Sequence, residues 1–185
     1  MKKIYTLITA MLLAMTATTL SACYWDDDEE LVYTLEGTWK GYMSVSSFWE
    51  GANYQTTYTE ITFLRNPYRY KSGEGYWVDY YSRAPWDYVA NHIEWTVEAG
   101  SIYVYFVEED YEVAIHDYRL DGYHLVGWLR DGDNDVEFRL TQTSSPNWSS
   151  YDHWGYDGWY NNWYTRGNAS DAKSAEKPRR VISQS

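Results

Sequence analysis

Residues 92–107, HIEWTVEAGSIYVYFV, decide the fold class of this sequence. Apolar and polar side chains alternate on both sides of Ala99-Gly100, and such alternation is typical of half-buried β-strands. A two-residue turn at Ala99-Gly100 joins two faces that alternation alone already makes apolar. The cross-strand pairs that this turn predicts are Trp95 with Val104 and Ile93 with Phe106. The stretch therefore predicts a β-hairpin with one buried face.

Short alternating strands continue on both sides of this hairpin, from residue 35 to 143. They are rich in Tyr, Trp, Thr and Val, which suit a pleated, half-buried surface. Eight antiparallel strands can close into a barrel, which removes exposed strand edges. The sequence thus predicts an all-β, eight-stranded antiparallel up-and-down barrel, with a two-sheet sandwich as the alternative. The expected strands are 38–46, 55–64, 69–81, 92–98, 101–107, 112–120, 123–130 and 136–141.

Two more turns set the register of the last strands. A turn at Asp121-Gly122 pairs Tyr118 with Leu125, and a turn at Asp133-Asn134 pairs Leu129 with Phe138. The first register turns His116 and Tyr118 into the barrel, where Trp39 and Trp95 are also expected. These four residues are the candidate ligand-binding site, with His116 as the polar end of an apolar cavity. The competing hypothesis is a core histidine, hydrogen-bonded in an interior that side chains fill.

A family resemblance covers residues 35–143. Leu35-Glu36-Gly37-Thr38-Trp39 resembles the Gly-x-Trp motif that opens lipocalins, and Asp117-Tyr118 falls near their Thr-Asp-Tyr motif, with His116 in place of the Thr. The layout, with Phe138-Arg139-Leu140 in the last strand, also resembles small lipocalin-like domains of bacterial lipoproteins from Bacteroidota-like Gram-negative envelopes. The resemblance implies a lipocalin-like barrel.

The N-terminus has the pattern of a secretory signal over residues 1–22. Lys2 and Lys3 precede a short apolar run, and Leu20-Ser21-Ala22-Cys23 resembles the lipobox of bacterial lipoproteins. The resemblance implies a diacylglycerol on the Cys23 thiol and a further acyl chain, such as palmitate, on the new amino terminus. Several acyl chains anchor stably where one does not. An ordinary signal peptide with a chance cysteine is the alternative.

Five consecutive carboxylates, residues 26–30, follow the cysteine within an expected linker, residues 23–34. They repel one another and an anionic membrane surface, so we expect the linker to be extended. They also resemble the surface-export signal of lipoproteins from the same phylum. We therefore expect an outer-membrane lipoprotein, displayed on the surface rather than facing the periplasm.

Residues 144–164 hold a segment rich in Trp and Tyr, without aliphatic residues between 147 and 164. Its spacing allows a short helix. It can cover the barrel mouth, remain disordered, or present Trp154, Trp159 and Trp163 to a sugar or a protein partner. The polar residues 165–185 predict a disordered tail.

Composition excludes several function classes. The formal net charge is −12, and it becomes −14 once Lys2 and Lys3 leave with the signal. An acidic chain is a poor match for nucleic acid.

Asp131, Asp133 and Asp135 alternate as in a calcium loop, but Val136 and Gln142 stand where such a loop needs Gly and Glu.

No metal site, cofactor or catalytic motif is predicted, although carboxylate pairs such as Glu94/Glu98 and Asp79/Asp87 leave an unrecognised hydrolase possible. The main hypothesis is a binding module for a small apolar or amphipathic ligand or a glycan. The alternative is a structural or interaction protein of the envelope, with a filled barrel and an aromatic partner-binding segment.

Overall fold

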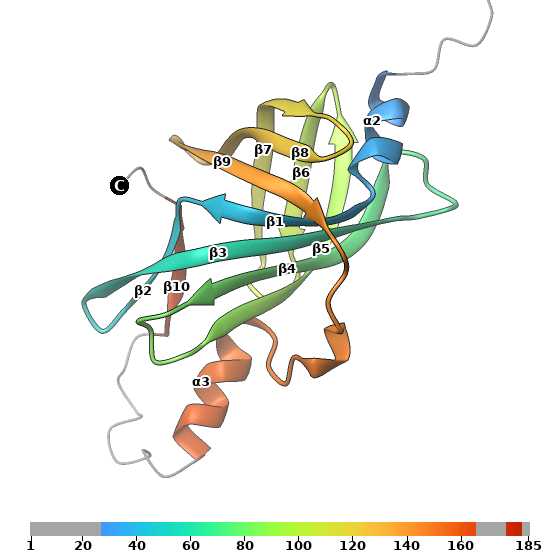
Figure 1. The fold of residues 1–185 in the computed structure, drawn as a ribbon. Helices are drawn as coiled ribbons and strands as arrows, with labels where there is room; N and C mark the ends of the chain where they lie inside the picture. Colours follow the sequence, from blue (N-terminus) through green and yellow to red (C-terminus); the bar gives the residue numbers. More distant parts are fainter. Residues whose placement is uncertain (1–26, 166–176, 183–185) are drawn as a thin grey trace, which may run out of the picture.

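The computed structural model describes residues 27–165 and 177–182, whose elements are shown in Figure 1. The predicted signal peptide and Cys23 lie outside the described residues. The helices are α2 (Asp27–Leu35), the 3-10 turn η1 (Trp148–Ser150) and α3 (Gly155–Thr165). The strands are β1 (Gly37–Met43), β2 (Val45–Trp49), β3 (Ala52–Arg65), β4 (Ser72–Tyr81), β5 (Tyr88–Glu98), β6 (Ser101–Phe106), β7 (Tyr111–Leu120), β8 (His124–Asp131), β9 (Asn134–Thr143) and β10 (Arg179–Ile182).

Eight of these strands form a closed antiparallel barrel. The order β1-β9-β8-β7-β6-β5-β4-β3 is closed by pairing of β1 with β3, in which Trp39 lies opposite Ile61. The up-and-down barrel is confirmed, and the sandwich is excluded. The expected first strand, 38–46, is divided at Ser44: β1 stays in the barrel, while β2 pairs with the other half of β3 and with β10.

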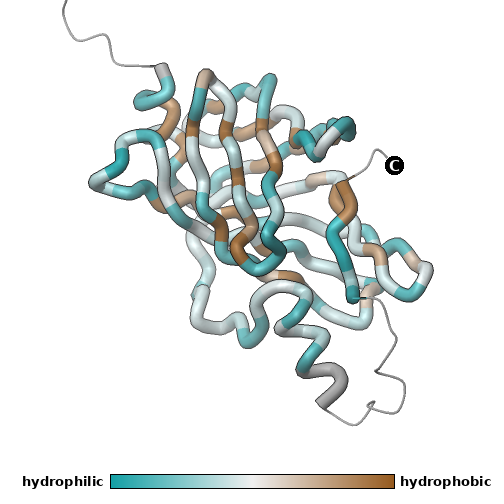
Figure 2. Tube along the Cα trace, turned by 180° about the vertical axis from the view of Figure 1, so that it is seen from behind, coloured by the Kyte–Doolittle hydropathy of each residue, from teal (hydrophilic) through white to brown (hydrophobic). Residues whose placement is uncertain are grey.

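Hydrophobic residues alternate with polar ones along the barrel strands, as the colours of the trace show (Figure 2). Their buried side chains form one core cluster in the barrel interior. Rings pack edge to face, with centroids 5.6 Å apart for Phe63 and Trp95 and 5.0 Å apart for Trp77 and Phe106. Such pairs add roughly 0.5–1.5 kcal/mol each beyond burial. The largest fully buried side chains are Trp39, Trp77, Phe63, Phe106, Phe138, Leu35, Met43, Ile61, Ile93, Ile102, Ile115 and Leu125.

The acidic segment is helical where an extended linker was expected. Asp27–Leu35 form α2, and Val32 and Leu35 are fully buried in the barrel core. Leu35 also accepts a hydrogen bond from Trp39 Nε1 at 2.8 Å. Asp28 accepts one from the Gly100 backbone N–H at 2.9 Å and pairs with Lys71 at 3.2 Å. The prediction failed because the apolar residues after the carboxylates have a barrel end to cover, which outweighs local charge repulsion.

The C-terminal strand corrects a second expectation. Residues 165–185 were expected to be a disordered tail, but Thr165 ends α3 and Arg179–Ile182 form β10. Strand β10 pairs antiparallel with β2, so that Val181 lies opposite Ser46 and Ile182 is buried. A four-residue strand carries no periodicity of its own, and only the exposed edge of β2 makes it favourable.

One predicted hairpin register is confirmed and two are wrong. Ile93–Phe106 and Trp95–Val104 are paired as expected. At the next hairpin the Asp121 carboxylate accepts hydrogen bonds from the backbone of Tyr123 and His124, which widens the loop so that Leu120 pairs with Leu125. At the last one Gly132 takes the positive φ of the turn, and Leu129 pairs with Val136. Both registers differ by two residues from the prediction, which leaves the faces of β9 unchanged.

Candidate functional site on the outer face of the barrel

Two of the four predicted ligand-binding residues lie inside the barrel, and a third packs against its core. Trp39 and Trp95 are 0% and 2% exposed, and the Trp95 Nε1–H donates to the Glu74 carbonyl at 2.9 Å. Tyr118 packs half-buried against the core, and burial raises the pKa of its phenol to about 12. These residues belong to a filled core, which favours the hypothesis of a packed interior.

His116 lies on the outer face, which corrects the prediction that it points inward. A β-bulge interrupts the β7–β8 pairing after His116, and Asp117 has a positive φ of 46°. The extra residue inverts the alternation, so that Ile115 faces the core and His116 lies opposite Trp128. Sequence alternation could not reveal the bulge, because neither Asp117 nor its neighbours is a glycine.

The imidazole of His116 is held by carboxylates. Its Nδ1 lies 3.0 Å from Asp117 Oδ2 and its Nε2 lies 3.0 Å from Asp135 Oδ1. The Arg130 guanidinium binds both Asp135 oxygens, at 3.0 and 3.1 Å, and together with His116 it lowers the pKa of that carboxyl. Both ring nitrogens of His116 therefore have carboxylate partners, as in a histidine with a structural role. Among the described residues, no group of three or more His, Cys, Asp or Glu side chains could hold a metal ion.

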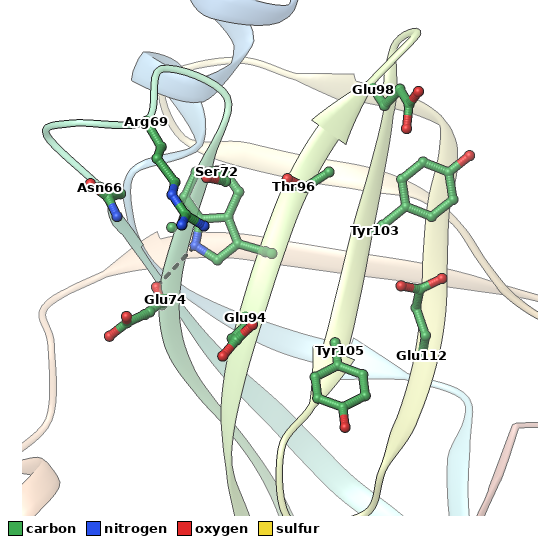
Figure 3. Close-up of a pocket in the computed structure, with 12 residues that line it drawn as sticks. Asn66, Arg69, Ser72, Glu74, Glu94, Thr96, Glu98, Tyr103, Tyr105 and Glu112 are labelled. Atoms are coloured by element: carbon green, nitrogen blue, oxygen red, sulfur yellow. Dashed lines mark hydrogen bonds between the residues drawn. The ribbon is translucent and has the colours of Figure 1, made fainter.

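A groove of about 560 Å³ lies on the outside of β4, β5, β6 and β7 (Figure 3). Glu74, Glu94, Tyr105 and Glu112 are direct cross-strand neighbours and form one row across its floor. A second row contains Ser72, Thr96 and Tyr103, and Glu98 lies beyond it. Asn66 and Arg69 come from the loop between β3 and β4 and line the same groove.

The charges of this groove are not balanced. None of its four glutamates has an ion-pair partner in the part of the chain that the structure describes. Glu74 and Glu94 are directly opposite each other, a position in which Cβ atoms are about 5 Å apart and like charges destabilise a sheet. The Tyr105 hydroxyl donates to Asp110 at 2.8 Å, and this hydrogen bond raises the pKa of the phenol. The row thus presents carboxylate acceptors to solvent at a cost in stability.

A glycine shapes one wall of the groove. Gly73 lies opposite Trp95, and a Cβ atom there would stand 2.7 Å from Trp95 Cζ2 and 2.0 Å from the Leu64 carbonyl oxygen. The absent side chain therefore allows the buried indole of Trp95 to pack directly against β4 beneath the groove. The sequence predicted Glu94 and Glu98 as a carboxylate pair, but it did not predict the row from Glu74 to Glu112. The alternating glutamates and tyrosines of 94–112 carried the signal, and only the register brings them together.

The aromatic segment packs on the barrel. The indole of Trp154 stacks on the His92 ring with centroids 3.9 Å apart, and Trp148 stacks on Tyr76 at 4.5 Å. Trp159 in α3 packs against Trp49 and Trp86, at 5.5 and 4.6 Å, in a second apolar cluster next to β2. The side chain of Trp163 lies outside the described residues. The expected short helix is present, and much of the aromatic surface is used internally.

Comparison with known proteins adds little to the fold class, which rests on the topology of the strands. No protein-family model and no curated protein matches the sequence. Among solved structures, the chain is similar to a redesigned β-barrel with 14% sequence identity and a TM-score of 0.35, over 62% of this chain and 95% of that one. The strand order and the β1–β3 closure by themselves assign the protein to the closed eight-stranded, lipocalin-like antiparallel barrels. Among the described residues, no helix is long and apolar enough to cross a membrane.

Proposed function

We propose that this protein is a membrane-anchored lipoprotein, displayed on the outer membrane through acylated Cys23, that binds its ligand in the outer groove of the barrel. The row of Glu74, Glu94, Tyr105 and Glu112 carries the proposal. A sheet gains nothing by placing two glutamates opposite each other, whereas a ligand that bears positive charge or hydroxyl donors removes the repulsion.

A ligand inside the barrel has less support than one outside. An eight-stranded barrel has room for side chains or for one small molecule, and here aromatic side chains fill it. An apolar ligand would have to displace Trp39, Trp95 or Phe63, each at most 2% exposed. Of the ligand classes considered from the sequence, a small apolar molecule is therefore disfavoured and a glycan is favoured.

The chemistry of the groove narrows the class of glycan. Carboxylates accept hydrogen bonds from sugar hydroxyls and bind ammonium groups, and the rings of Tyr103 and Tyr105 offer flat surfaces for sugar rings. Four carboxylates against the single Arg69 favour a cationic ligand. A glycan that contains free amino sugars combines both properties.

Calorimetric titration of the lipid-free mature protein tests the proposal with three probes. These are glucosamine oligosaccharides, the same oligosaccharides fully N-acetylated, and oligolysine. We expect the glucosamine oligosaccharides to bind, and Glu94→Gln to weaken that binding roughly tenfold, since a hydrogen bond to a charged group contributes about 1.5–3 kcal/mol. Binding should also weaken as salt is added.

A matched control is Glu50→Gln, which removes the same charge at the β2–β3 hairpin. Glu50 lies in the turn just before β3 begins at Ala52. The groove borders the other end of β3, where Arg65 pairs with Gly73. Equal binding by the Glu94→Gln and Glu50→Gln proteins would reject the groove as the site. Equal affinity for oligolysine would instead indicate a cationic peptide partner, and no binding by any probe would reject this ligand class.

A second candidate is a structural or interaction protein of the envelope, and the filled interior favours it too. Its partner-binding residues would be Trp154, Trp159 and Trp163, but Trp154 and Trp159 are already packed against barrel residues. This leaves less aromatic surface for a partner than the sequence suggests, so the groove remains the better-supported site. We infer no enzymatic activity from either surface.

A further inference from the structure

A buried arginine occupies the end of the barrel next to α3. Strand β10 carries Arg180, whose side chain is 2% exposed and forms ion pairs with Asp79 and Glu109. The guanidinium binds Glu109 through two parallel contacts, Nη2–Oε1 at 3.1 Å and Nε–Oε2 at 3.3 Å. This forked geometry distinguishes a guanidinium from an ammonium ion.

The site around this guanidinium is built by barrel residues. Asp79 is fully buried and also accepts hydrogen bonds from Thr59 Oγ1 at 2.5 Å and Trp77 Nε1 at 3.1 Å. Glu109 accepts one from Asn91 Nδ2 at 2.8 Å. Strands β3, β4 and β5 therefore hold the carboxylates through hydrogen bonds that do not involve β10.

Aromatic rings complete the site. The Arg180 guanidinium carbon lies 4.4 Å from the centre of the Phe106 ring and 5.9 Å from that of a Trp77 ring. Both distances are within the range of cation–π attraction. The two carboxylates thus require a cation, because removal of one partner from a buried charge cluster leaves the others uncompensated.

Arg180 is distant in the chain from the carboxylates that it binds, and its site adjoins a surface cavity. Residues 79–109 supply the anionic groups, whereas Arg180 follows 71 residues after Glu109. A surface cavity of about 350 Å³ adjoins the site and is lined by Arg180, Glu109 and Tyr156. A small cation can therefore approach the position of the guanidinium from solvent.

We propose that this end of the barrel is a binding site for guanidinium groups, independent of the outer groove, and that Arg180 of the C-terminal strand is its tethered occupant. The site selects a guanidinium over other cations by the fork to Glu109, the contact with Asp79 and the ring of Phe106. A free guanidinium compound takes the place of the side chain when Arg180 is truncated.

Chemical rescue of the Arg180→Ala variant tests this site in the full mature chain. We expect a lower thermal unfolding midpoint than in the wild type, and recovery of at least about half of the loss with millimolar methylguanidinium, because a ligand that binds only the folded state stabilises it. Methylammonium has the same charge without the fork and should restore little. The Arg180→Ala/Glu109→Gln double variant should not respond to methylguanidinium.

Arg179→Ala is the matched control, because Arg179 is the exposed neighbour in the same strand. It should unfold close to the wild-type temperature and show no rescue. If Arg180→Ala does not fold alone, methylguanidinium must restore its near-ultraviolet circular dichroism during refolding. Absence of rescue in either format, or equal rescue by methylammonium, overturns the proposal.

Discussion

Several tyrosines keep their hydroxyls within the core or against it. Burial is the main cause that raises the pKa of Tyr81, Tyr111 and Tyr156, and it raises that of Tyr118 to about 12. Phenols of an unfolded chain ionise near pH 10. Between about pH 10 and the native pKa values the unfolded state binds fewer protons than the native state, so stability falls as pH rises through this window.

Alkaline titration checks this prediction at the residue scale. An early rise in tyrosinate absorbance should leave the far-ultraviolet circular dichroism native. The buried tyrosines should ionise only as the barrel unfolds, so that the last rise in tyrosinate absorbance coincides with loss of strand signal. Complete ionisation in a chain with native dichroism would contradict the assigned burial.

At the scale of elements, the aromatic segment before α3 is held by ring contacts on β4 and β5. Trp154 stacks on His92 and lies 5.6 Å from Tyr76 between ring centroids. We expect Trp154→Ala to lower the free energy of unfolding by about 1–3 kcal/mol, since each aromatic pair contributes about 0.5–1.5 kcal/mol beyond burial. Urea denaturation followed by circular dichroism measures this difference.

The control for this element is Tyr68→Ala, because Tyr68 is 89% exposed in the loop between β3 and β4. Its effect should stay within about 0.5 kcal/mol, as is usual for surface substitutions. If Trp154→Ala proves as stable as Tyr68→Ala, the segment does not stabilise the barrel, and its Trp residues become available for the partner-binding alternative.

At the scale of the whole molecule, the protein is proposed to be a barrel tied to a membrane by its N-terminus. Cys23→Ser removes the thiol that would carry the diacylglycerol, so the protein should move from the membrane fraction to the soluble fraction. Fractionation and incorporation of a labelled fatty acid measure this change. A Cys23→Ser protein that stays in the membrane fraction would reject lipid anchoring, whatever the groove binds.

Surface display is a separate prediction for the whole molecule. The wild-type lipoprotein should be degraded when intact cells are treated with protease, and it should be protected if it faces the periplasm. A periplasmic marker protein that stays intact in the same sample shows that the outer membrane has not been breached. Protection of the wild-type chain would place the ligand search inside the envelope.

The sequence alone determined the antiparallel strands, because alternation with period two specifies which side chains share a face. Closure into a barrel rather than a sandwich was decided by the pairing of β1 with β3. It also predicted that Trp39, Trp95 and Tyr118 point inward, and the hairpin at Ala99-Gly100 has the expected register. These features depend on neighbours within one strand or one hairpin. Local pattern was sufficient where the strands are regular and the turn dipeptide was identified correctly. At the last hairpin the strands are also regular, but the turn is Gly132-Asp133 instead of the expected Asp133-Asn134.

The tertiary structure decided the features that depend on partners far apart in the chain. The bulge at Asp117 turned His116 outward. Residues 179–182, which were expected to be disordered, form strand β10 because they pair with the free edge of β2. The row from Glu74 to Glu112 exists only through the register of four strands, and Arg180 finds its carboxylates only in the closed barrel. Both candidate sites therefore escaped a local pattern, because each is assembled from charges that are close in space and distant in sequence.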